Sequence, residues 1–173
     1  NAVILANAIR TGAHGIAPIC DLNLSSLLTA ERGYLRMDTL NEALHQINTQ
    51  LAKLEIFKHY DINEKPHASL DGLKVASKLR NVMARHSPKF LGQDAGVSSY
   101  NLIFNFLAIT GRLISSNQYE GNFNFEMMLH QNTSDFNIEY ASTDKHGINS
   151  LNFALFDLTD YIFAPRIPKP HKQ

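Results

Sequence analysis

The stretch FNIEYASTDKHG, residues 136–147, changes character near its middle. Apolar and polar residues alternate from Phe136 to Tyr140, which predicts a half-buried β-strand over residues 136–141. An acid, Asp144, follows the strand, and a lysine, a histidine and a glycine come directly behind it. A plain turn would explain this order of residues. Asp144 therefore points to chemistry only if a second acid elsewhere in the chain is placed to meet it.

Strands and helices of ordinary length are predicted on both sides of this stretch. Strands are predicted at 67–71, 100–109, 112–116 and 161–164, and helices from 124 and over 150–158. Gly72 is predicted to turn the chain after the first strand, and Thr110 with Gly111 to form a hairpin turn. The resulting order from residue 66 onward is β, β, β, α, β, α, β. Such an order predicts an α/β fold of the ribonuclease-H-like kind, a mixed sheet with flanking helices.

Residues 1–65 lack the alternating pattern and are predicted to be helical. Apolar residues recur at three- and four-residue spacing from Leu40 to Phe57, which predicts one long amphipathic helix with Asp38 or Thr39 as its N-cap. We therefore expect two parts, a helical segment over 1–65 that packs on a core, and the ribonuclease-H-like core over 66–173.

The composition is that of a globular protein. The 173 residues are 44% hydrophobic and 18% charged, which suits one domain of ordinary size. Cys20 is the only cysteine, so no internal disulfide can form, and we expect a reducing compartment and no structural zinc. Because no apolar run approaches the roughly 20 residues that a bilayer span needs, no membrane partner is expected.

Charge is balanced overall but not locally. Sixteen basic and sixteen acidic side chains cancel, whereas a dedicated nucleic-acid scaffold is usually basic. Between Asp71 and Asp94 there is no acid, and the basic residues there are Lys74, Lys78, Arg80, Arg85 and Lys89. This segment is a candidate for contacts with DNA phosphates. The alternative is an ordinary solvated positive face.

Asp71 is the acid that could meet Asp144. In the predicted sheet the first and fourth strands lie side by side, so the two carboxylates would emerge next to each other. Like charges that close repel unless a cation lies between them. Magnesium suits the pair because it takes hard oxygen ligands and binds through one or two carboxylates together with substrate phosphate oxygens. Two such ions about 4 Å apart would support phosphodiester cleavage or exchange. Each acid alone is also explained by a turn, since Asp71 and Gly72 form an ordinary turn dipeptide.

Three short blocks of sequence stand in a fixed order along the chain. Residues 69–72 are S-L-D-G, residues 143–147 are T-D-K-H-G, and residues 161–167 are Y-I-F-A-P-R-I. They resemble the motifs S-x-D-G, T-D-T-H-G and G-Y-x-F-A-P-R-I of the DDE catalytic domain in transposases of the class II, replicative bacterial transposons, the Tn-three family. The stretch HSPKFLGQDAGVSSYN, residues 86–101, is similar to an aromatic and glycine-rich stretch of the same family. The two acids are separated by 144 − 71 = 73 residues.

The resemblance implies an enzyme that nicks the 3′ ends of a transposon and joins them to target DNA. It implies two Mg²⁺ or Mn²⁺ ions held by two Asp and one Glu, with Asp71 and Asp144 as catalytic residues and metal ligands. The Glu does not carry over, because no Glu follows Asp144, and Asp157 and Asp160 are expected at the exposed end of a helix. We therefore expect a catalytic domain that stops before its third acid, which lies beyond Gln173 or is lost, and a fragment that is inactive alone.

Three further residues are candidates for contacts with DNA. Lys145 stands where the family has Thr and could bind a phosphate, and His146 could orient water or phosphate or simply cap a turn. Arg166 could contact DNA or hold the end of the last strand. Two smaller departures from the family pattern are Leu70, in place of a small or polar residue, and Asp160, in place of Gly. The expected partners are transposon ends and target DNA, with a homo-oligomer for the full-length protein and the bacterial cytoplasm as its compartment.

Two other functions are considered. A catalytically inactive transposase remnant, serving as a DNA-binding or interaction module, would keep the fold and lose the acid triad. A magnesium phosphatase with Asp71 as its nucleophile is disfavoured, because such enzymes need a second acid two residues later, where this chain has Leu73.

Overall fold

The structure is a computed structural model that describes residues 1–60, 66–78, 81–130 and 136–167. The chain forms two compact units, residues 1–43 and residues 44–173. No helix in the described ranges is long and apolar enough to cross a membrane.

The first unit is helical, as predicted. It contains α1 (Ala2–Ala8), α2 (Gly12–Ile16), η1 (Ala17–Ile19), α3 (Leu24–Tyr34) and the beginning of α4 (Met37–Leu51). Its small core consists of Val3, Ala6, Ala13, Ile16 and Leu27. The side chain of Asn23 accepts a hydrogen bond from the Ser26 N–H and so caps α3.

The long helix predicted up to Phe57 ends earlier than expected. α4 stops at Leu51, and after a tight turn the chain continues as a 3₁₀ helix, η2 (Glu55–Tyr60). Phe57 then packs against the core of the second unit, with its ring centroid 5.8 Å from that of Phe136. The apolar spacing alone predicts one helix. In the structure the α-helix ends at Leu51, and Phe57 packs against the core from a separate 3₁₀ helix.

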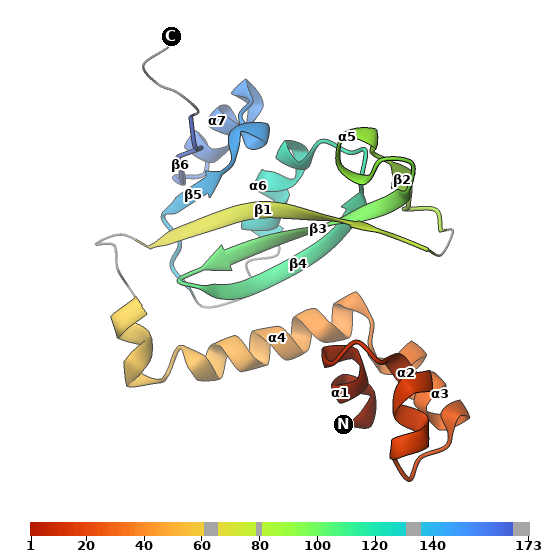
Figure 1. The fold of residues 1–173 in the computed structure, drawn as a ribbon. Helices are drawn as coiled ribbons and strands as arrows, with labels where there is room; N and C mark the ends of the chain where they lie inside the picture. Colours follow the sequence, from red (N-terminus) through yellow and green to blue (C-terminus); the bar gives the residue numbers. More distant parts are fainter. Residues whose placement is uncertain (61–65, 79–80, 131–135, 168–173) are drawn as a thin grey trace. The chain divides into compact units, whose positions relative to one another are not determined.

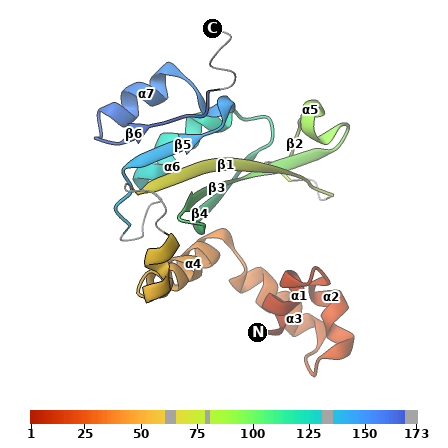
Figure 2. The ribbon, with the colours of Figure 1, turned by 60° about the vertical axis from the view of Figure 1, so that its left-hand side comes forward.

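The second unit is a six-stranded mixed sheet with helices. Its elements are β1 (His67–Ala76), β2 (Arg85–His86), α5 (Pro88–Leu91), β3 (Ala95–Phe104), β4 (Leu107–Ser115), η3 (Glu120–Phe123), α6 (Asn124–His130), β5 (Tyr140–Thr143), η4 (Lys145–Gly147), α7 (Ser150–Asp157) and β6 (Ile162–Phe163). β1 lies between β3, to which it is antiparallel, and β5, to which it is parallel (Figures 1 and 2). β4 pairs antiparallel with β3, and β6 pairs parallel with β5. The prediction of an α/β fold in which the first strand lies beside the fourth predicted strand is confirmed.

The first strand is twice as long as predicted. β1 does not turn at Gly72 but continues to Ala76, with Gly72 paired to Tyr100 of β3. Asp71 therefore lies in the middle of its strand, and the prediction that it ends the strand is wrong. Glycine is required at position 72 for a steric reason and not for a turn, because a Cβ there would lie 2.4 Å from the Glu120 carboxyl carbon.

The hairpin turn also lies elsewhere. β3 and β4 are joined at Asn105 and Phe106, which both have positive φ, and not at Thr110 and Gly111. Positive φ at both central residues is the geometry of the two-residue turn that suits twisted strands. Thr110 is buried inside β4, and Gly111 lies opposite Asn101, whose side-chain oxygen would be 2.7 Å from an added Cβ.

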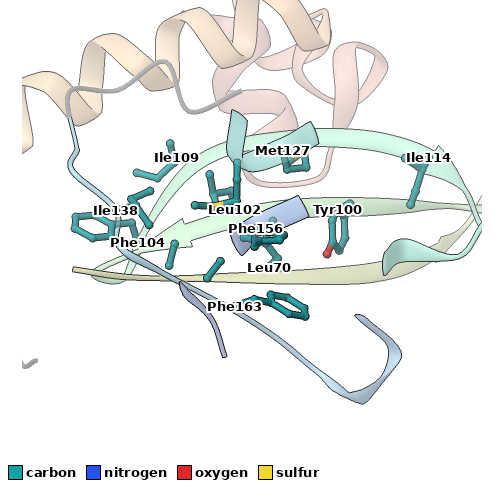
Figure 3. Packing of buried hydrophobic residues seen from close by; sticks show 13 residues of the cluster. Leu70, Tyr100, Leu102, Phe104, Ile109, Ile114, Met127, Ile138, Phe156 and Phe163 are labelled. Atoms are coloured by element: carbon teal, nitrogen blue, oxygen red, sulfur yellow. The ribbon is translucent and has the colours of Figure 1, made fainter. Parts of the chain in front are cut away.

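The core of the second unit lies between one face of the sheet and the helices α6 and α7. Figure 3 shows Leu70, Tyr100 and Leu102 from the sheet meeting Phe156 from α7. Met127 and Met128 of α6 are fully buried, while Leu129 is 45% exposed. α7 follows its prediction closely, whereas β5 begins at Tyr140 and not at Phe136.

Candidate active site

Asp71 and Asp144 occupy neighbouring positions on two parallel strands. The register of β1 and β5 pairs Leu70 with Thr143, so the next residue along each strand is one of the two aspartates. Buried residues alternate along β1, with Leu70 buried and Asp71 exposed, so Asp71 lies on the face away from the main core. Asp144 directly follows the carboxyl end of β5, whereas Asp71 lies in the middle of the longer β1. The sheet thus brings together two acids that lie 144 − 71 = 73 residues apart in the sequence.

Asp144 is held by the turn that follows it. Its Oδ1 accepts a hydrogen bond from the His146 N–H at 2.8 Å, which caps the short helix η4. Its Oδ2 lies 2.6 Å from Nδ1 of the His146 ring. The two side chains are only half exposed, at 47% and 42%. His146 therefore fixes the orientation of the Asp144 carboxylate, and the residue that caps the turn is Asp144 and not His146.

A third carboxylate lies against β1 and was not anticipated. Asp71 accepts a hydrogen bond from the Gly72 N–H at 2.8 Å, and the Glu120 carboxylate fills the space where Gly72 lacks a Cβ. Oε1 of Glu120 accepts a hydrogen bond from the Ser98 hydroxyl at 2.8 Å and lies 3.9 Å from the Lys74 ammonium. Glycine at position 72 is therefore what allows the Glu120 carboxylate to lie against the backbone of β1.

No sequence motif marks Glu120. It follows the polar stretch Asn117, Gln118 and Tyr119, and such a stretch predicts a loop and nothing more. The nearness of Glu120 to Gly72 depends on the pairing of β1 with β3 and β4, which is a long-range property of the sheet.

The pKa of the buried Tyr100 phenol is affected by the carboxylates of Asp71, Glu120 and Asp144. Its hydroxyl donates a hydrogen bond to Oδ1 of Asn124. Burial raises the pKa of Tyr100 far above its usual value, and the negative charges of Glu120, Asp71 and Asp144 raise it further. Tyr100 therefore lies within electrostatic reach of all three acids.

A hollow lies beside Glu120 and His146. It has a volume of about 220 Å³ and is lined by Lys74, Lys89, Phe90, Asn117, Gln118, Tyr119, Glu120 and His146. The Lys74 ammonium lies 4.6 Å from the centre of the Phe90 ring, and that of Lys89 lies 5.0 Å from it. His146 is the residue that joins the hollow to Asp144.

The basic residues predicted to contact DNA are spread over several elements. Lys78, Arg85 and Lys89 are exposed, and Arg80 lies outside the described residues. The Lys74 side chain is only 16% exposed, and its ammonium donates to the Ser116 carbonyl at 2.7 Å, so it is already engaged within the unit.

The remaining two DNA candidates lie near the end of β5. Lys145 is exposed in η4. Arg166 has an exposed side chain, while its backbone N–H donates to the Thr143 carbonyl at 2.8 Å and extends the pairing beyond β6. Lys145, His146 and the two aspartates are therefore grouped, whereas Lys78 and Arg85 belong to the other end of β1.

The carboxylates of Asp71 and Asp144 suit a divalent ion that also binds a substrate. Within the described ranges, no three acidic, histidine or cysteine side chains are grouped so that they could hold a metal ion by themselves. Two hard carboxylates, Asp71 and Asp144, are nevertheless what Mg²⁺ takes when substrate phosphate and water complete its shell. Asp157 and Asp160 are exposed at the end of α7, as expected.

Comparison with known proteins gives one family and two further similarities. The family model described as "Tn3 transposase DDE domain" matches residues 1–173. The transposase for transposon gamma-delta of Escherichia coli (strain K12) is 26% identical over 172 residues, which cover 96% of this chain. The chain spans 17% of the length of that curated relative. A cryo-EM structure of the piggyBac transposase synaptic complex with hairpin DNA is 12% identical with a TM-score of 0.47, covering 100% of this chain and 39% of that one. At that score the likeness carries no argument about fold.

Proposed function

The chain belongs to the Tn3 transposase DDE domain family, and from this we propose that it supplies two of the metal-binding acids with which a transposase cleaves and joins DNA. The observation that carries the proposal is the register of β1 and β5, which makes Asp71 and Asp144 neighbours. The same two residues stand in the blocks S-L-D-G and T-D-K-H-G.

We also propose that residues 66–173 have the ribonuclease-H-like fold and that the helical segment over 1–65 packs on this core. The order of the strands supports the first part. Three antiparallel strands, β4, β3 and β1, are followed across the sheet by β5 and β6, which run parallel to β1. The helices α6 and α7 supply the buried side chains that cover one face of this sheet.

In this proposal Asp71 and Asp144 hold one or two divalent ions, Mg²⁺ or Mn²⁺, together with phosphate oxygens of the DNA. When bound, such ions supply activation of the attacking water or hydroxyl and stabilisation of the leaving oxygen. His146 keeps the Asp144 carboxylate in one orientation through its ring nitrogen. Outer partners of this kind commonly tune metal sites by 10- to 100-fold in affinity or activity. Lys145, exposed next to Asp144, is placed to attract a phosphate.

The proposed reaction is hydrolysis at the 3′ ends of the transposon, followed by joining of these ends to target DNA. The partners are then DNA and, in the full-length transposase, further copies of the same protein. Because the substrate is bacterial DNA, the proposed compartment is the bacterial cytoplasm.

A DNA-binding module without catalysis is the second candidate. It is favoured by the partners that the carboxylates already have, since Asp144 is paired with His146 and Glu120 with Lys74. Carboxylates neutralised within the domain would leave DNA binding to the exposed basic residues.

The experiment that tests the proposal replaces each aspartate in the full-length transposase. We expect Asp71→Asn and Asp144→Asn to lower 3′-end nicking by more than about 100-fold, because each removes a metal ligand and not merely an outer partner. Asp157→Asn, which changes an exposed acid at the end of α7, is the matched control and should retain full nicking.

The binding of Mn²⁺ by this chain, followed by electron paramagnetic resonance, separates the two candidates. Saturable binding that both aspartate variants weaken supports the metal site. Full nicking by either variant would remove the assignment of Asp71 and Asp144 as ligands and leave the DNA-binding module.

A further inference from the structure

The hollow that His146 joins to Asp144 has the size and lining of a subsite for one planar group. Its volume of about 220 Å³ is below the roughly 300 to 1,000 Å³ of pockets for drug-sized ligands. Duplex DNA cannot enter such a space, whereas one base that has left its stack can. His146 lines the hollow and bonds to Asp144, so any occupant lies next to the acids.

Phe90 provides an aromatic surface at this place. It belongs to the short helix α5 and is 52% exposed, so part of its ring is open to a ligand. Lys74, whose side chain is only 16% exposed, lies against the ring from within the domain. Exposed aromatic rings beside positive charge are the means by which proteins hold unpaired nucleotides, because every base has a face that can stack.

The rest of the lining suits the edge of a base better than it suits an anion. Asn117 and Gln118 carry amide groups, which offer both donors and acceptors, and the Glu120 carboxylate is an acceptor for an exocyclic amino group. The carboxylate would repel a phosphate placed in the hollow. Lys89 is an exposed residue whose ammonium lies 5.0 Å from the centre of the Phe90 ring, so it can meet the phosphate of a nucleotide whose base stacks there.

We propose that this hollow binds one unstacked nucleobase of the DNA, stacked on Phe90, in the nucleotide next to the phosphate that reacts. The proposal rests on the proposed function, because it takes Asp71 and Asp144 as the place of reaction. It adds that the DNA must be locally unpaired there. A base held outside the duplex would keep the neighbouring phosphate at a fixed position near Asp144.

The test uses the absence of tryptophan, since the chain contains none and therefore gives little background to a fluorescent base. A short single-stranded oligonucleotide with 2-aminopurine is titrated with the chain in the presence of EDTA. We expect saturable quenching as the base stacks on Phe90. Phe90→Leu should abolish the quenching and weaken binding by roughly 5- to 150-fold, which corresponds to the loss of one base–aromatic stack. Phe90→Tyr, which keeps the ring, should bind as the unchanged chain does.

Phe106→Leu is the matched control, because Phe106 is another exposed phenylalanine, 72% exposed, at the turn between β3 and β4. It should leave both quenching and affinity unchanged. Lys89→Ala is a second variant, which leaves the Phe90 ring in place. It should reduce the slope of the logarithm of the binding constant against the logarithm of the salt concentration by about the amount due to one phosphate contact.

Three results would overturn the proposal. The first is equal quenching by Phe90→Leu and the unchanged chain. The second is a loss of binding in Phe106→Leu as large as that in Phe90→Leu. The third is complete displacement of the oligonucleotide by inorganic phosphate at concentrations near the dissociation constant of phosphate itself, which would show that the hollow binds an anion. Because the titration contains no metal and no cleavage is measured, its outcome is independent of the Asp71 and Asp144 test.

Discussion

The charges of the candidate site raise the pKa of one buried side chain, Tyr100. Its phenol is almost fully buried, bonds to Asn124 and has a pKa raised first by burial and then by Glu120, Asp71 and Asp144. The unfolded chain has no such surroundings, so its tyrosines lose their protons near pH 10. A group whose pKa is higher in the folded state stabilises the fold below the unfolded value, and this contribution is lost as the pH rises above it.

We therefore predict that the free energy of unfolding of the sheet unit falls as the pH rises above about 10. Tyr100→Phe should reduce this fall, by up to about 1.4 kcal/mol for each pH unit. At neutral pH the same variant should be less stable by about 1 to 3 kcal/mol, because buried Asn124 loses its donor. Urea unfolding between pH 7 and 11 measures both effects, and an unchanged slope in Tyr100→Phe would contradict the prediction.

The residues of the site divide into those that sequence can indicate and those it cannot. Asp71 and Asp144 stand in motifs, and both follow or lie within segments with a strand pattern. Glu120 stands in no motif, and Phe90 stands in the family-like stretch 86–101, which by itself indicates no role for it. The places of both depend on the packing of β1 against β3 and α5. Asp160 is intermediate. It stands where the family has Gly, and the structure gives it a φ of 60°, in the left-handed region that glycine favours.

At the scale of elements, β1 shows why local signals placed the turns wrongly. Asp71 followed by Gly72, and Thr110 followed by Gly111, are common turn pairs, yet both lie inside strands. Glycine was needed there because another residue approaches the backbone, Glu120 at position 72 and Asn101 at position 111. A turn and a close approach both select glycine, and the sequence alone does not separate them. The helix α7 was predicted well because its cap, Asn149, and its end are local features.

The two interpretations of Gly72 give different results on substitution. Gly72→Ala should destabilise the sheet unit by about 1 to 3 kcal/mol, because the new methyl group displaces the Glu120 carboxylate from Ser98 and Lys74. Gly33→Ala is the control with the opposite sign. Position 33 lies in α3 with nothing within 4 Å of an added Cβ, so the helix should gain about 0.5 to 1 kcal/mol. Denaturant unfolding followed by hydrogen exchange compares the two, and a neutral Gly72→Ala would argue against the close approach.

At the scale of the whole molecule, each unit has a hydrophobic core of its own. The core of the helical unit includes Leu27, which is 1% exposed, and that of the sheet unit includes Leu102, which is fully buried. The two clusters share no residue. Each core is therefore expected to determine the stability of its own elements.

Leu27→Ala should cost the helical unit about 2 to 5 kcal/mol, the usual range for a cavity in a core. Amide hydrogen exchange should then be faster in α1, α2 and α3, with no change in β1 and β3. Leu102→Ala is the reciprocal variant and should affect the strands alone. Faster exchange throughout the chain in either variant would show that the two cores unfold as one.

The long separation between the paired strands β1 and β5 has a consequence for the cell. A chain still being synthesised carries Asp71 for dozens of residues before its neighbour Asp144 exists, and closing a loop of that length has an entropic cost. Under the proposed function, an incomplete or proteolysed product that lacks β5 has Asp71 without its neighbour Asp144, and so lacks the ion site with which DNA would be cut. The pairing of β5 with β1 would then limit DNA cleavage to chains that have completed their fold.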